Sequence, residues 1–162
     1  MMEKQYADYS WEMASRLLAI DSPSGYTEKA AQWVCDRFRQ LGFDARLTRK
    51  GGVLVDFGGE NKEDGLLLEA HTDTLGAMVC QVKGSGALKL TSLGGMNANN
   101  AEAENVRVYT RDGRVYEGTC QLHDPSIHVN GGYNDAKRSW DSVEIILDED
   151  VHSQEDVKAL GI

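Results

Sequence analysis

The residues of this sequence best suited to chemistry are a histidine and an aspartate two positions apart, His71 and Asp73. They end the stretch LLLEAHTD, in which three leucines at 66–68 lead through Glu69 to the pair. Side chains alternate between the faces of a regular strand, so Glu69, His71 and Asp73 would share one face. A neutral imidazole can bind a divalent metal through one nitrogen while the other donates to a carboxylate. The pair therefore fits a metal site, although this spacing alone is more often that of a structural His–Asp pair.

Four other ionisable side chains could join such a site. Glu69 could add a carboxylate ligand, but a lone carboxylate is more often solvated or paired with a lysine. His123 and His128 lie five positions apart in QLHDPSIHV, a predicted loop, and not at a ligand spacing on one element. His152 precedes a predicted helix, and we expect it to be an exposed polar residue.

Two further patterns have conformational explanations. Ser22 and Ser24 in DSPSG lack the GxSxG context of a nucleophilic serine, so we expect them to close a turn. The glycine-rich stretch at 51–59, GGVLVDFGG, lacks the lysine and the following helix of a phosphate loop. Turns and bulges explain its glycines.

Composition narrows the class of protein. The chain of 162 residues has 26 acidic and 17 basic residues and a net charge of −9, without a Lys/Arg cluster, so no nucleic-acid partner is expected. No apolar run approaches the ~20 residues that span a bilayer, and the N-terminal residues do not resemble a signal peptide. We therefore expect a cytoplasmic protein with no membrane partner.

Cys35, Cys80 and Cys120 lack CxxC spacing, which predicts buried free thiols.

The first part of the sequence predicts helices followed by strands. Apolar residues three and four apart predict a helix over 6–20, which must end before Pro23. A second helix should begin after Thr27 as its N-cap and end at Gly42, a typical left-handed residue. Strands are predicted at 44–49, 53–59 and 65–73. The apolar run in the last of these favours a buried strand in an α/β sheet that is covered on both faces.

After Gly76 the sequence changes to short alternating strands separated by turns. Asp112 and Gly113 mark a hairpin, and the pattern predicts a small β-barrel or sandwich. A final helix should have Ser153 as its cap and end at Gly161. The strands are predicted at 77–83, 87–95, 104–110, 115–122 and 142–148. Two domains are therefore expected, 1–75 and 76–162.

Several stretches together resemble one family. IDSPSGYTEKAAQWV, LTRKGGVLVDFGG, LLLEAHTDTLGAMV, LKLTSLGG and ALGI occur in the order found in the tetrahedral (TET), or glutamyl-aminopeptidase-like, dinuclear metallopeptidases, which are also called cellulase-like or deblocking aminopeptidases. The resemblance covers essentially the whole chain. AHTDTLGAMV is similar to the family's His-x-Asp-x-x-Gly signature, which is more specific than the His–Asp spacing alone.

The resemblance implies a fold and a set of roles. The fold would be the first part of a phosphorylase/hydrolase-like zinc-peptidase α/β domain with an inserted small β-barrel. The barrel would form a homodimer, and the resemblance implies further assembly into larger shells. By resemblance, His71 binds one of two zinc or cobalt ions, Asp73 is a supporting catalytic residue, and His128 could act near a neighbouring subunit's site. The reaction that the resemblance implies is the removal of N-terminal residues from peptides. Two metals suit this reaction, because they can polarise the scissile carbonyl and activate a water molecule.

The sequence also departs from the family's pattern. The family's Asp-Asp-Arg segment, its Glu-Glu pair and its later Asp and His follow the barrel, and none of these occurs in the present residues. We therefore expect an incomplete site that is inactive alone, in a piece of a longer protein or in a chain that another completes. Absent neighbours would leave an apolar face exposed. The alternative is a non-catalytic scaffold or subunit-interaction module. A glycosidase is disfavoured because no pair of carboxylates flanking a cleft can be identified.

Overall fold

The computed structural model describes residues 2–61 and 63–162 and divides into two compact units, Met1–Gly76 and Ala77–Ile162. Helices and strands occur in both units, so the protein is of the mixed α/β class. Of the described helices, none combines the length and the apolar character that crossing a bilayer requires.

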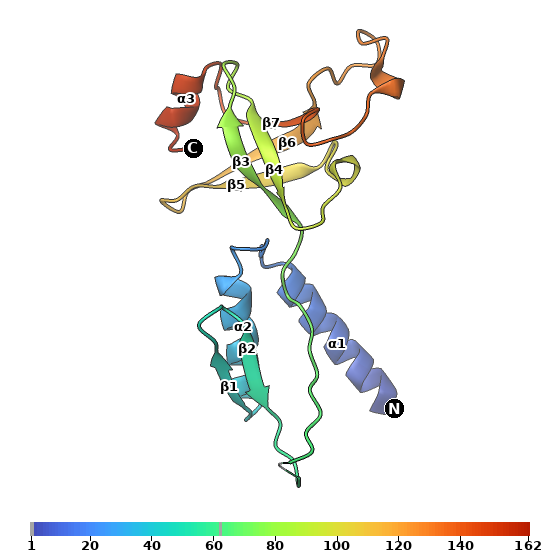
Figure 1. Ribbon diagram of the computed structural model, residues 1–162, viewed down its shortest axis with the longest axis vertical. Coiled ribbons are helices and arrows are strands. Elements are labelled where there is room, and N and C mark those ends of the chain that lie inside the picture. Colours follow the sequence, from blue (N-terminus) through green and yellow to red (C-terminus); the bar gives the residue numbers. More distant parts are fainter. Residues whose placement is uncertain (1, 62) are drawn as a thin grey trace. The chain divides into compact units, whose positions relative to one another are not determined.

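The first unit has two helices and one hairpin (Figure 1). Its elements are α1 (Met2–Leu18), α2 (Glu28–Gln40), β1 (Asp44–Leu47) and β2 (Val53–Asp56). The strands pair antiparallel with Leu47 opposite Val53, and α2 packs against both strands. Gly42 follows α2 with a φ of +90°, which confirms the predicted left-handed end of this helix.

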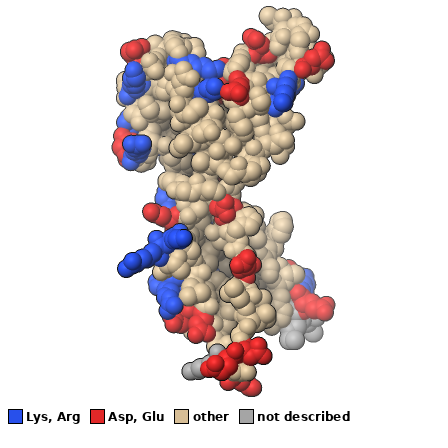
Figure 2. Space-filling model, in the orientation of Figure 1, with Lys and Arg blue, Asp and Glu red and all other residues tan. Residues whose placement is uncertain are grey.

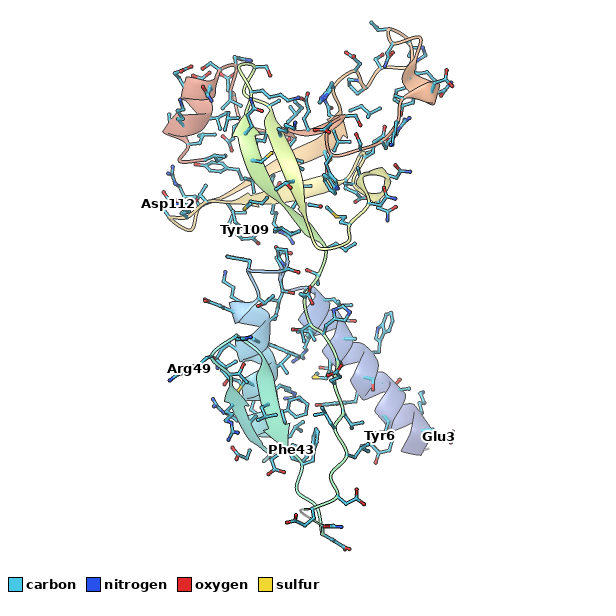
Figure 3. The ribbon with its side chains drawn as sticks, viewed as in Figure 1. Glu3, Tyr6, Phe43, Arg49, Tyr109 and Asp112 are labelled. Atoms are coloured by element: carbon cyan, nitrogen blue, oxygen red, sulfur yellow. The ribbon has the colours of Figure 1, made fainter. Side chains whose placement is uncertain are left out.

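Small residues and three aromatic rings hold α2 to the hairpin. Ala30 and Cys35 are fully buried on α2. Phe38 of α2 lies edge to face with Phe43 and Phe57, at centroid separations of 6.2 and 5.7 Å, and the last two rings are 5.1 Å apart. Figure 3 labels Phe43 beside the hairpin. Phe43 and Phe57 remain 36% and 56% exposed, so the rings join α2 to the hairpin at the surface, and the buried residues of the unit are small ones such as Ala30 and Ala45.

The predicted buried strand at 65–73 is wrong. This segment is extended but is not assigned to a strand, and Leu66, Leu67 and Leu68 are 86%, 76% and 72% exposed. A strand requires a neighbouring backbone, and in this stretch of the described chain the bridge formed is between Pro23 and Thr74. The predicted sheet covered on both faces is therefore reduced to the β1–β2 pair. The expected exposed apolar surface is present.

The second unit is built on one antiparallel sheet. Its strands are β3 (Gly76–Val82), β4 (Leu88–Leu93), β5 (Asn105–Tyr109), β6 (Val115–Leu122) and β7 (Val143–Leu147), in the order β3-β4-β7-β6-β5. Asp112 lies at the tip of the β5–β6 hairpin, as predicted (Figure 3). As far as the structure describes the chain, β3 and β5 are the edges of this half-barrel, so a closed barrel stays a prediction.

The core of this unit is formed mainly by residues of β4, β6 and β7, and α3 (Gln154–Ala159) adds Val157 to it. Leu88, Val143 and Val157 are fully buried. The hydroxyl of Ser153 accepts a hydrogen bond from the Asp156 amide at 3.2 Å, which confirms the predicted helix cap. The remaining core residues are Leu90, Ala98, Ala101, Val108, Cys120, Leu122, Ile145 and Leu147.

The three cysteines are free, but one of the predictions of burial is wrong. Cys35 and Cys120 are buried, and burial raises the pKa of the Cys120 thiol to about 11. Cys80 is exposed because it lies on the outer face of the edge strand β3, where its neighbour on that face, Met78, is also exposed.

The long loop at 123–142 between β6 and β7 is tied to the body of this unit by Arg138. Its guanidinium donates to both carboxylate oxygens of Glu102, at 2.7 and 3.2 Å, and to the carbonyls of Tyr133 and Ala136. The Tyr133 hydroxyl donates to the same carboxylate at 3.2 Å. A bidentate Arg–carboxylate contact between two largely buried side chains is strong, so it fixes the course of the loop.

A stability test follows from Gly118, which lies in β6 between β5 and β7. A Cβ there would be 2.5 Å from the Ile146 carbonyl oxygen and 3.0 Å from Ile145 Cγ2. We expect Gly118→Ala to lower the free energy of unfolding by about 1–3 kcal/mol in urea titrations, because the backbone must move to admit the methyl group. Gly84→Ala is the control, since nothing lies within 4 Å of a Cβ there. Equal stabilities of the two variants would contradict the packing described.

A pH test follows from Glu102, whose pKa is lowered from its ordinary value of 4.5, chiefly by the hydrogen bond from Arg138. A lowered folded-state pKa stabilises the protein above the ordinary value and loses that stabilisation as the pH falls through the lowered one. Glu102→Gln should therefore be less stable than the wild type at neutral pH and lose less stability below pH 4.5. Denaturation at several pH values measures this, with the exposed Glu104→Gln as control. Parallel pH profiles for wild type and Glu102→Gln would refute the role of this pair.

Candidate functional site

His71 and Asp73 contact each other through one side of the imidazole. Nδ1 of His71 lies 3.2 Å from Oδ1 of Asp73 and 3.2 Å from its carbonyl oxygen. An ionised carboxylate and a carbonyl can only accept hydrogen bonds, so these partners assign the proton to Nδ1. The lone pair of Nε2 is then free to bind a cation, and the side chain is 85% exposed.

The other carboxylate oxygen of Asp73 has its own partner. The Ser24 hydroxyl donates to Oδ2 at 2.7 Å, across 49 positions of sequence. This hydrogen bond is the largest cause that lowers the pKa of Asp73 from its ordinary value, and the backbone amide and His71 lower it further. The carboxylate is therefore ionised at neutral pH and accepts from Ser24 and His71 at once.

A set of backbone contacts holds the loop at 22–24 beside the segment at 72–74. The Thr74 amide donates to the Ser22 carbonyl at 2.9 Å, and the Ser22 amide donates to Oγ1 of Thr74 at 3.3 Å. The hydroxyl of Ser22, which is fully buried, donates to the Thr72 carbonyl at 2.9 Å. These bonds substitute for the missing strand pairing and fix the position of Asp73.

Gly76 permits this close approach. A Cβ at this position would lie 2.4 Å from Cβ of Pro23 and 3.1 Å from its Cγ. The φ of Gly76 is not in the left-handed region, so the requirement for glycine is one of space. The glycine three positions after Asp73 is therefore explained by the packing of the proline loop.

The donors present do not make up a complete metal site. A structural or catalytic zinc ion takes at least three protein ligands. Within residues 2–61 and 63–162, no group of three His, Cys, Asp or Glu side chains is close enough to hold a metal ion. Glu69 is exposed, and in the described part of the chain its carboxylate has no hydrogen-bond or ion-pair partner. His71 could thus fill one coordination position.

His123 belongs to a cluster in the second unit. Its Nδ1 lies 3.1 Å from Nζ of Lys83 and 3.2 Å from Oε2 of Glu144, which accepts from Lys83 at 2.6 Å. Its Nε2 donates to the Asp141 carbonyl at 2.7 Å. With both nitrogens engaged, His123 ties the ends of the 123–142 loop together.

The remaining histidines are exposed. His128 lies in the 123–142 loop, and His152 pairs with Asp150 at 2.9 Å with its side chain 85% exposed, as expected of a surface residue. A hollow of about 410 Å³ in the second unit is lined by Met96, Arg138 and Trp140 among others, and includes none of the candidate residues.

Comparison with known proteins identifies the family. Residues 51–162 match the model of the M42 glutamyl aminopeptidase family. The chain belongs to this family. Its members are hydrolases, and aminopeptidases of the M42 family are metal-dependent.

Two curated relatives and one solved structure illustrate the similarity. The Bacillus subtilis (strain 168) protein named "Putative aminopeptidase YhfE" is 34% identical over 151 residues, which are 93% of this chain and 44% of that protein. The lysyl aminopeptidase of Pyrococcus furiosus is 25% identical over 152 residues, which are 93% of this chain and 42% of that protein. The solved structure is that of the Pyrococcus horikoshii TET1 peptidase, which can assemble into a tetrahedron or a large octahedral shell. The TM-score is 0.71 at 22% identity, and the match covers 92% of this chain and 43% of that chain.

Two facts follow from these comparisons. The similarity to the TET1 peptidase shows that this chain shares the fold of the matched part of that protein. The chain spans less than half of the length of the two curated relatives described above.

Sequence reasoning missed Ser24 as a partner of Asp73. Its role in a turn is confirmed, since the Tyr26 amide donates to the Pro23 carbonyl at 2.8 Å. Nothing in DSPSG, however, indicates that the hydroxyl reaches a residue 49 positions away. The Ser24–Asp73 contact could have been predicted from two features taken together. These are two hydroxyl residues that flank a proline before a helix, and a distant His-x-Asp-x-x-Gly.

Gly76→Ala should displace the proline loop. The added methyl group would overlap Pro23, so we expect a loss of about 1–3 kcal/mol in the free energy of unfolding and changed NMR shifts at Ser24 and Asp73. Gly65→Ala is the matched control, because a Cβ there meets nothing within 4 Å. Unchanged shifts at Ser24 and Asp73 in Gly76→Ala would show that the loop does not depend on this contact.

Proposed function

We propose that this chain supplies the first part of the active site of a metal-dependent aminopeptidase, with His71 as a metal ligand and Asp73 as its supporting residue. The observation that carries the proposal is the hydrogen bond from Nδ1 of His71 to Asp73, which leaves Nε2 exposed. A ligand histidine ordinarily donates its second nitrogen to such an oriented carboxylate. Membership of the M42 family supports the same roles.

In the complete enzyme, bound zinc or cobalt ions would polarise the scissile carbonyl and lower the pKa of a bound water. The described residues contribute one ligand position and the carboxylate behind it. We propose that the other ligands come from further polypeptide of the kind that the longer relatives contain. No step of the reaction is therefore assigned to the present residues beyond holding the imidazole with its proton on Nδ1.

Each unit has a separate proposed task. Residues 1–75 are proposed to belong to the catalytic α/β domain, and residues 76–162 to a barrel-type domain through which copies associate. Large uncharged areas on the visible face of the second unit (Figure 2), together with exposed Met78 and Val115, support association. His128 is proposed to act near a neighbouring subunit's site, and its exposure in the 123–142 loop is compatible with this. Peptides with a free N-terminus are the proposed substrates.

The proposed role of His71 can be tested in a chimera. The matching stretch of the lysyl aminopeptidase would be exchanged for this chain, and the folded product assayed for bound metal and for hydrolysis of lysyl peptides. We expect His71→Ala to lose one metal site and about a hundredfold or more in kcat/KM, because a ligand loss removes the metal's contribution to the transition state. His152→Ala is the matched control, since its side chain is equally exposed and also pairs with an aspartate two positions away.

Two outcomes would contradict the proposal. Full metal content and turnover in the His71→Ala chimera would remove His71 from the ligand set. A folded chimera that binds no metal and hydrolyses nothing would favour the alternative, in which the chain is a scaffold or subunit-interaction module.

A further inference from the structure

We propose that Ser24 is a positioning residue for His71, which acts by fixing the rotation of the Asp73 carboxylate between the serine hydroxyl and the imidazole. Two hydrogen bonds join the three side chains: the Ser24 hydroxyl donates to Oδ2 of Asp73, and Nδ1 of His71 donates to Oδ1 of Asp73. The proposal deepens the proposed function, on which it rests for the role of His71 as a ligand.

The Asp73 carboxylate would rotate freely without a partner for its second oxygen. Rotation about the last bond of an aspartate is broad, and the Asp73 side chain is 41% exposed, so packing alone does not hold it. A carboxylate that rotates exchanges its two oxygens and weakens any bond that depends on one of them. The 2.7 Å bond from Ser24 occupies Oδ2 and thereby keeps Oδ1 directed to His71.

The serine hydroxyl is itself held in place. Ser24 follows Ser22, whose backbone and hydroxyl bind Thr74 and Thr72, and the Tyr26 amide closes the turn on the Pro23 carbonyl. The donor is therefore supported on both sides in sequence. Ser22, which is buried and binds backbone groups, stabilises the loop, whereas the bond of the Ser24 hydroxyl goes to the functional carboxylate.

The orientation of the Asp73 carboxylate influences which nitrogen of the imidazole carries the proton. An oxygen of Asp73 directed at Nδ1 favours the tautomer with the proton on Nδ1, and this is the tautomer whose Nε2 can accept a cation. Without Ser24, the Asp73 carbonyl would be the acceptor that still faces Nδ1 in the present geometry, so the form with the proton on Nε2 would gain population. A protonated Nε2 has no lone pair for a metal. Ser24 would thus contribute to metal binding without touching the metal.

The test is the tautomer of His71 in the 162-residue chain, read from the two imidazole ¹⁵N shifts. Spectra would be recorded at about pH 8.5, about two units above the ordinary histidine pKa, where imidazole is neutral. We expect the Nδ1–H form to dominate in the wild type and its ratio to the Nε2–H form to fall about threefold or more in Ser24→Ala. Ser24→Thr keeps a hydroxyl and should retain the wild-type ratio. Ser24→Cys, with a weaker donor, gives an intermediate ratio and replaces Ser24→Ala if that variant does not fold.

The outcomes separate this proposal from the proposed function. An unchanged ratio in Ser24→Ala, or a wild-type ring with its proton mainly on Nε2, would overturn the role of Ser24. The tautomer is measured without metal or substrate, so failure of the His71→Ala chimera to lose activity would overturn the proposed function and leave the Ser24 result as it stands. A ratio that falls in Ser24→Ala and is restored in Ser24→Thr supports the positioning role, because a merely structural loop contact would not follow the hydroxyl.

Discussion

The candidate site depends on the hydrogen bonds that join the loop at 22–24 to the segment at 72–74. Thr74 and Thr72 are bound by the backbone and hydroxyl of Ser22, and Asp73 by the hydroxyl of Ser24. The residues before them are extended with exposed leucines and belong to no strand of the described sheets. This loop is therefore the element that gives the His–Asp pair a defined position in the present structure.

The chemistry of the His71–Asp73 pair follows from the fact that each oxygen of the Asp73 carboxylate has a different partner. One oxygen accepts from Ser24 and the other faces Nδ1 of His71, so the proton of the ring and the open Nε2 lie on opposite sides of the imidazole. Gly76 leaves the space that Pro23 needs for this approach. The pattern His-x-Asp-x-x-Gly thus has a physical meaning here: an imidazole that is the proposed ligand, the carboxylate that orients it and a residue small enough to admit the supporting loop.

Local features were predictable from the sequence and distant ones were not. The end of α2 at Gly42, the hairpin at Asp112 and the Ser153 cap were found because each depends on neighbouring residues. The strand at 65–73 was predicted wrongly, because apolar content indicates burial but does not supply the backbone that a strand must pair with. Cys80 was missed because a short edge strand has an outer face, and Ser24 because its partner is 49 positions away.

Amide hydrogen exchange, resolved by residue, tests the central claim most directly, because it reports whether the loop or a sheet holds the site segment. The account predicts that the Thr74 amide, which donates to Ser22, exchanges about tenfold or more slowly than the Leu67 amide in the exposed part of the segment. Equal and rapid exchange at both amides would show that the loop does not hold the pair, and strong protection at Leu67 would show that a strand does.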